Sequence, residues 1–88
     1  MLSKAELRRV LRETPSENVI EFFFQQANLS KTESKIILLH YKEGMTFFEL
    51  SELLYVDVKT IQRRVGSGSK KLSAYLDGVR WLLEGILK

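Results

Sequence analysis

Apolar residues recur along the chain at spacings of three and four, the period of a helix with one buried face. In the first third of the sequence these positions are Leu7, Val10, Leu11, Val19, Ile20, Phe23, Phe24 and Ala27. Later they are Ile36, Ile37, Leu39, Tyr41, Phe47, Leu50, Leu54, Val58, Ile61, Val65, Leu72, Tyr75, Leu76, Val79 and Leu83. No stretch alternates as a strand would. The pattern predicts an all-α fold, a small helical bundle of five to six helices.

Four segments match the capping box, in which a Ser or Thr side chain caps a backbone amide and a Glu three residues later bonds back. They run from Ser3 to Glu6, Thr14 to Glu17, Ser30 to Glu33 and Thr46 to Glu49. The second would place Pro15 at the first helical position, where proline is favoured. Asp57 is a weaker N-cap, and Gly44 is placed to end the third helix.

Two glycines interrupt the last long apolar pattern, in the segment Gly66 to Ser69. Each costs a helix about 1 kcal/mol relative to alanine. The segment is therefore either a break or a place where another helix approaches closely. We expect a final helix from about Lys70 to Leu87. The chain then forms a single domain, with an N-terminal helical extension over 1–28, a helix-turn-helix core over 29–76 and a C-terminal helix over 70–88.

The composition excludes several classes of function. The chain has no cysteine, and His40 is its only histidine, so we expect neither a disulfide nor a metal site. No nucleophile elbow or phosphate-binding glycine loop is present, and we expect no enzyme activity and no cofactor. The apolar runs are too short to span a membrane, and the N-terminus lacks the apolar core of a signal peptide. A cytoplasmic location without membrane contact is expected.

The net charge is only +3, but its distribution is uneven. Residues 13–57 carry eight acidic and three basic side chains, whereas residues 58–76 carry five basic and no acidic ones. An acidic body with one acid-free basic stretch is expected when a single surface faces phosphate. Residues 1–12 hold a second basic group, Arg8, Arg9 and Arg12, which serves either solubility or an additional contact.

Residues 46–65 are predicted to form two short helices joined by a tight turn, a helix-turn-helix unit whose second helix enters the major groove of DNA. The small residue Ser51 lies where the two helices would cross. Three outward positions of the second helix are the expected base contacts: Lys59, Gln62 and Arg63. The expected phosphate contacts are Thr60, Arg64, Lys70 and Lys71. The alternative for all of them is an ordinary solvated helix face.

Residues Leu29 to Leu76 resemble the four-helix DNA-binding domain shared by sigma-factor region 4 and LuxR/GerE-type regulators. The matching landmarks are the segments Leu29 to Glu33, Glu43 to Thr46, Glu49 to Glu52 and Val58 to Ile61, followed by Lys70 to Leu72. The resemblance implies double-stranded DNA as the partner and a role in bacterial or phage transcription regulation.

The chain departs from this family in two places. Tyr55 stands where the turn usually has glycine, and a non-glycine residue with positive φ costs on the order of 1 kcal/mol. We therefore expect a turn of different shape. Family members also form helix through the positions of Gly66 and Gly68. A small phage or mobile-element regulator could diverge in this way.

Some apolar residues are not explained by a single inward stripe, and exposed aromatic clusters often mark interfaces. The candidate partner interface comprises Phe22, Phe24, Phe48, Trp81, Leu82 and Ile86. Two arrangements are open for the wide stripe of the last helix. The N-terminal helices cover it within one monomer, or it forms a homodimer that binds paired half-sites.

Two functions follow from these patterns. The first is sequence-specific DNA binding. The second is a protein-interaction module that keeps the helix-turn-helix fold and acts on RNA polymerase or another regulator without contacting DNA bases. The segment from Lys59 to Lys71 favours the first, whereas Tyr55, the glycines and the acidic body favour the second.

Overall fold

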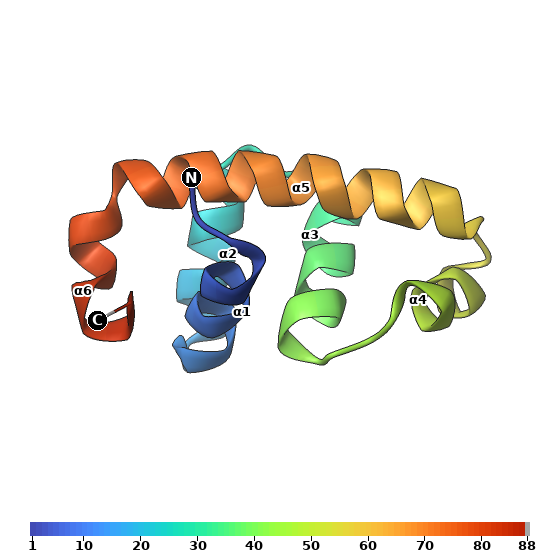
Figure 1. The fold of residues 1–88 in the computed structure, drawn as a ribbon, viewed down its shortest axis with the longest axis horizontal. Coiled ribbons are helices and arrows are strands. Elements are labelled where there is room, and N and C mark those ends of the chain that lie inside the picture. The colour runs from blue at the N-terminus through green and yellow to red at the C-terminus, as the bar shows by residue number, and fades with distance from the viewer. Residues whose placement is uncertain (88) are drawn as a thin grey trace.

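A long helix, α5 (Val58–Gly78), runs nearly the whole length of the molecule, and the other helices lie along one side of it (Figure 1). The computed structural model describes residues 1–87, with side chains to residue 85. The other elements are α1 (Lys4–Glu13), α2 (Glu17–Gln26), α3 (Lys31–Ile37), the π-helix η1 (Leu38–Lys42), α4 (Phe47–Leu54), the 3₁₀-helix η2 (Arg80–Leu83) and α6 (Glu84–Leu87). The expected all-α bundle is confirmed. No helix within residues 1–87 has the length and apolar character needed to cross a membrane.

Three of the four expected capping boxes are present, at Ser3, Ser30 and Thr46. Each hydroxyl accepts a bond from a backbone amide at 3.1 Å. Each partner glutamate accepts one in return from the capping residue. These bonds satisfy amides that a helix start would otherwise leave without a partner. Local sequence therefore fixes where α1, α3 and α4 begin.

The predicted capping box at Thr14 is wrong. Thr14 instead ends α1, where its hydroxyl donates a 2.6 Å hydrogen bond to the carbonyl oxygen of Val10. Pro15 lies between the helices, and Ser16 caps α2 by accepting a bond from the amide of Val19. Thr14 and Ser16 are both candidate N-caps for α2. Because the hydroxyl of Thr14 bonds to Val10 at the end of α1, Ser16 is the residue that caps α2.

The helix does not break at Gly66 to Ser69, so the expected separate helix from Lys70 to Leu87 is also wrong. The other alternative, close approach of another helix, is found at Gly68, where α3 packs against α5. A Cβ atom at this position would lie 2.9 Å from Cγ1 of Ile37 on α3. The helix ends instead at Gly78, and Val79 (φ −117°, ψ 27°) redirects the chain into η2.

The N-terminal helices pack into the same core as the rest of the chain. Buried residues from α1, α2, α3, α5 and η2 form one continuous cluster, which includes Leu7, Leu11, Ile20, Phe23, Ile37, Leu72, Leu76 and Leu83. The hydroxyl of the buried Ser73 donates to the carbonyl oxygen of Leu2 at 3.0 Å, which ties the N-terminus to α5. α1 and α2 thus cover much of the apolar stripe on the C-terminal half of α5.

A π-helical turn extends α3. The amide of Glu43 donates to the carbonyl oxygen of Leu38, one residue farther back than in an α-helix. The buried Tyr41 lies in this turn, and its hydroxyl is 2.8 Å from Oγ of Ser69 on α5. Gly44 (φ 76°) then stops the helix as predicted.

Gly66 and Gly68 of α5 should respond oppositely to alanine. Gly66→Ala should raise the free energy of unfolding by about 0.5 to 1 kcal/mol, because nothing lies near its missing Cβ and alanine favours helix. Gly68→Ala should lower it by about 1 to 3 kcal/mol, because the new methyl group meets Ile37. Denaturant unfolding of both variants measures the difference. Equal stabilisation by both would mean that the distance between α3 and α5 is not fixed.

Candidate nucleic-acid interface

A turn of three residues, Tyr55 to Asp57, joins α4 to the start of α5 at one end of the molecule (Figure 1). The fully buried Leu50 of α4 and Ile61 of α5 belong to the shared core. The amide of Val56 donates to the carbonyl oxygen of Ser51 at 3.0 Å and closes the turn. Asp57 is the N-cap of α5 as predicted, although its side chain makes no capping bond.

Tyr55 adopts the left-handed conformation, with φ 55° and ψ 43°. The prediction of a differently shaped turn is therefore wrong, because Tyr55 takes the backbone conformation that usually calls for glycine. Its side chain is 95% exposed. The backbone strain is thus not offset by packing of the ring within the protein.

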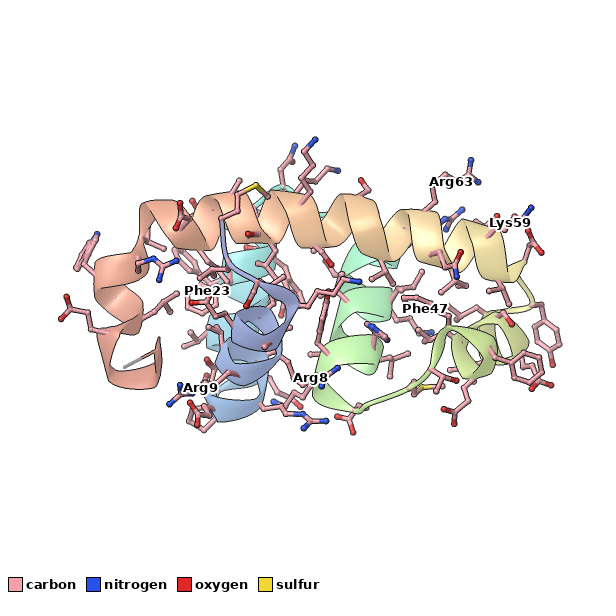
Figure 2. All side chains as sticks on the ribbon, viewed as in Figure 1. Arg8, Arg9, Phe23, Phe47, Lys59 and Arg63 are labelled. Atoms are coloured by element: carbon pink, nitrogen blue, oxygen red, sulfur yellow. The ribbon has the colours of Figure 1, made fainter. Side chains whose placement is uncertain are left out.

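The first turns of α5 present polar side chains on the face turned away from the core. Lys59, Gln62 and Arg63 are exposed, whereas Ile61 and Val65 on the opposite face are buried. Lys59 and Arg63 point away from the helices that lie beneath α5 (Figure 2). The three residues predicted to contact bases therefore share one accessible face.

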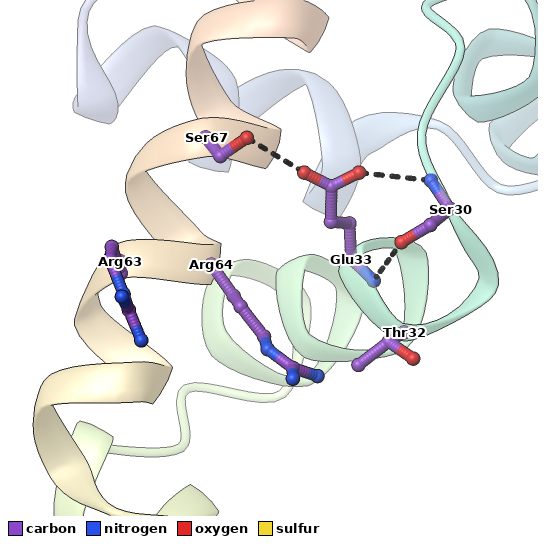
Figure 3. A pocket seen from close by; sticks show the side chains of 6 residues that line it. All are labelled: Ser30, Thr32, Glu33, Arg63, Arg64 and Ser67. Atoms are coloured by element: carbon purple, nitrogen blue, oxygen red, sulfur yellow. Dashed lines mark hydrogen bonds between the residues drawn. The ribbon is translucent and has the colours of Figure 1, made fainter.

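The four predicted phosphate contacts have different surroundings. Arg64 is exposed beside a hollow between α5 and the start of α3 (Figure 3). Thr60 is half-buried, and its hydroxyl accepts a 3.4 Å bond from Arg63. Lys70 is exposed. Lys71, in contrast, places its ammonium nitrogen 3.0 Å from a carboxylate oxygen of Glu33. Arg64 and Lys70 are therefore the more accessible cations.

Glu33 connects α3 to α5 through both of its carboxylate oxygens. Oε1 accepts from the amide of Ser30 at 3.0 Å, and Oε2 accepts from the hydroxyl of Ser67 at 2.9 Å (Figure 3). Oε1 also accepts from the ammonium group of Lys71. Burial by itself raises the pKa of Glu33, but these hydrogen bonds and the charge of Lys71 outweigh it and lower the pKa to about 2.

Sequence reasoning assigned Glu33 only to a capping box and missed its contacts with α5. The available signal was the spacing of Ser67 and Lys71, which lie four residues apart and so share one helix face. The spacing alone does not identify their partner, because it lies more than thirty residues away in sequence.

The candidate partner interface does not form one patch. Phe48 is 63% exposed on α4, whereas Trp81 (69% exposed) and Leu82 lie on η2 at the other end of α5 (Figure 1). Phe22 is exposed on α2. Phe24 is buried in the core, so its assignment to an interface is wrong. The side chain of Ile86 lies outside the described residues. Homodimerisation stays a prediction.

The other polar residues considered from sequence have simple environments. Arg8, Arg9 and Arg12 are exposed on α1, and Arg9 pairs with Glu13 at 3.3 Å. Nδ1 of His40 lies 2.8 Å from the carbonyl oxygen of Met45. Within the described part of the chain, no group of three potential metal-binding side chains is found.

No protein-family model matches the chain, and neither the curated proteins nor the solved structures contain a significant match to it.

Glu33 should make stability depend on pH in the acidic range. Because folding lowers its pKa from 4.5 to about 2, its contribution is complete above the unfolded value and is lost as the pH falls toward 2. Glu33→Gln should therefore cost about 2 kcal/mol near neutral pH and flatten the loss of stability between about pH 5 and pH 2. Denaturant unfolding across this range measures both effects.

Glu49→Gln is the matched control, because Glu49 has the same capping-box position on α4 but is exposed. It should have the smaller effect. An equal effect of the two substitutions would mean that the contacts between Glu33 and α5 add nothing to capping.

Proposed function

We propose that this protein binds duplex DNA sequence-specifically and regulates bacterial or phage transcription, with α4 and α5 acting as a helix-turn-helix. The observation that carries the proposal is the exposed face of α5 that follows the tight turn at Tyr55, in a stretch over residues 58–76 that has five basic and no acidic side chains. In such units the second helix enters the major groove with its N-terminal residues toward the base edges. The resemblance of residues 29–76 to sigma-factor region 4 and LuxR-type domains supports the same function.

Three side chains would contact bases. Arg63 can donate two parallel hydrogen bonds to O6 and N7 of guanine, and Gln62 can bond N6 and N7 of adenine. Lys59, one turn before Arg63 on the same face, would reach an adjacent base. The hydrogen bond from Arg63 to Thr60 is 3.4 Å long and exposed, so the guanidinium can exchange it for a base.

Phosphate groups on either side of the groove would be held by Arg64, Lys70 and the hydroxyl of Thr60. Such contacts position a protein without specifying sequence. Lys71 contributes less, because its charge is already paired with Glu33. The excess of acidic residues over 13–57 disfavours approach of DNA to the rest of the surface.

A second candidate is a protein-interaction module that acts on RNA polymerase or another regulator without contacting bases. It is favoured by Tyr55, whose strained backbone supports a nearly fully exposed ring. Strain without internal compensation is often kept for function. Exposed Phe48 on α4 adds apolar area nearby in sequence. The DNA proposal is preferred because it accounts for the charge of α5.

DNA binding should weaken with salt. Arg64 and Lys70, the two accessible cations proposed to hold phosphates, would release condensed counterions. The slope of log affinity against log salt concentration should therefore be about −1.8, at about 0.9 per phosphate contact. Fluorescence anisotropy with random duplexes gives this slope. Absence of binding to any duplex at low salt would leave the interaction module as the better candidate.

Arg63 and Lys70 should have separable roles on the bound DNA. Arg63→Ala should cost about 1 to 3 kcal/mol on the preferred sequence and little on random DNA, because it removes a base contact. Lys70→Ala should weaken binding to all sequences alike and make the salt slope shallower by about 1. Selection from a random duplex library supplies the preferred sequence. Equal losses on both kinds of DNA for Arg63→Ala would contradict its assignment as a base contact.

A further inference from the structure

A groove of about 610 Å³ lies between α2 and the continuous helix formed by α3 and η1. Four apolar residues line it: Ile20 and Phe24 from α2, Leu29 from the connection, and Leu38 from η1. Ile20 and Phe24 are buried members of the core, and Leu29 and Leu38 are half-buried beside them. The groove is therefore an apolar surface with a rigid base.

Both walls of the groove are single helix faces. α2 contributes Glu17, Ile20, Glu21 and Phe24, which follow the spacing of three and four residues of one helical stripe. α3 and η1 contribute Lys31, Ser34, Lys35, Leu38 and Lys42 with the same kind of spacing. A space bordered by two helices in this way accepts a third helix, which packs its own stripe between them.

The two walls carry opposite charge. The α2 wall has Glu17 and Glu21, and α2 contains no basic residue. The other wall has Lys31, Lys35 and Lys42, with Glu43 following at the end of η1. Among residues 1–85, whose side chains are described, no ion pair involves the two glutamates of the α2 wall or the three lysines of the other wall. Each wall therefore keeps its charge available for an occupant.

The acidic wall argues against nucleic acid as the occupant, since Glu17 and Glu21 would repel phosphate. Lys31 and Lys35 also border a second hollow, which Arg64 lines as well, but Lys42 and the two glutamates do not. The groove is thus a surface distinct from the face of α5 proposed to contact DNA.

The geometry points to an amphipathic α-helix of a partner protein as the occupant of this groove. Its apolar residues would cover the half-buried Leu29 and Leu38, its basic flank would lie against the α2 wall, and its acidic flank against the lysines. A second copy of this chain fits less well. Helices α2 and α4 carry exposed apolar residues but no basic ones that could face the α2 wall. Trp81 and Leu82 lie on a 3₁₀-helix of four residues, which is too short to fill the groove.

Three synthetic peptides of about 16 residues, long enough to populate a helix, test the proposal. All share one apolar stripe, and they differ in their flanks: one basic and one acidic, both acidic, or both basic. A helix can lie in either direction, so the mixed peptide always finds one orientation that matches both walls. In fluorescence anisotropy with the intact chain it should bind on the order of tenfold more tightly than the other two.

Exchanging the charge of the α2 wall should change this preference. In a Glu17→Lys, Glu21→Lys variant both walls are basic, so the peptide with two acidic flanks should become the tightest binder. Glu52→Lys, on the exposed face of α4, is the matched control and should keep the original order. Circular dichroism melting verifies that each variant is folded.

Several outcomes would overturn the proposal. Equal affinity for the three peptides, no binding of any of them, or an unchanged order in the double variant would each exclude a charge-matched helix site. Sedimentation equilibrium tests the remaining possible occupant of the groove, a second copy of the chain. A dimer of the intact chain that Lys42→Glu converts into a folded monomer would assign the groove to a second copy instead. Duplex binding is measured on the same variants, so loss of DNA affinity is distinguishable from loss of peptide affinity.

Discussion

The close packing of α3 against α5 is the constraint on which the rest of the molecule depends. Gly68 lets the two helices approach so closely that a Cβ atom at its position would lie 2.9 Å from Cγ1 of Ile37. Glu33 then joins them with hydrogen bonds to Ser67 and Lys71. The close contact at Gly68 and the hydrogen bonds of Glu33 therefore lie on neighbouring turns of α5. The position of α3 therefore sets the position of the whole long helix.

In this arrangement the two ends of α5 differ: one end is exposed and the other packs into the core. The first turns of α5 present Lys59 and Arg63 to solvent, whereas its later turns bury Leu72 and Leu76 on the side where α1 and α2 lie. Because the helix is unbroken, the exposed face is held by core packing at both ends. The glutamate that fixes α3 also uses the charge of Lys71, so stability and surface potential are coupled in this region.

Local signals in the sequence were sufficient for the fold class and most helix starts, since Ser3, Ser30 and Thr46 each carry their capping partner within one turn. They were insufficient where the structure depends on contacts between residues that are distant in sequence. The continuity of α5 depends on packing against α3, and the burial of Phe24 depends on how α2 lies against the rest of the core. The exposed face of the candidate site follows from helical spacing alone, but the partner of Lys71 does not.

The π-helical turn at Leu38 to Lys42 sets which side chains after it face α5. One extra residue is accommodated in that turn, and each residue of an α-helix rotates the chain by about 100°. Regular α-helix over the same residues would therefore rotate Tyr41 away from Ser69. The bond from the amide of Glu43 to the carbonyl oxygen of Leu38 thus maintains the register that joins η1 to α5.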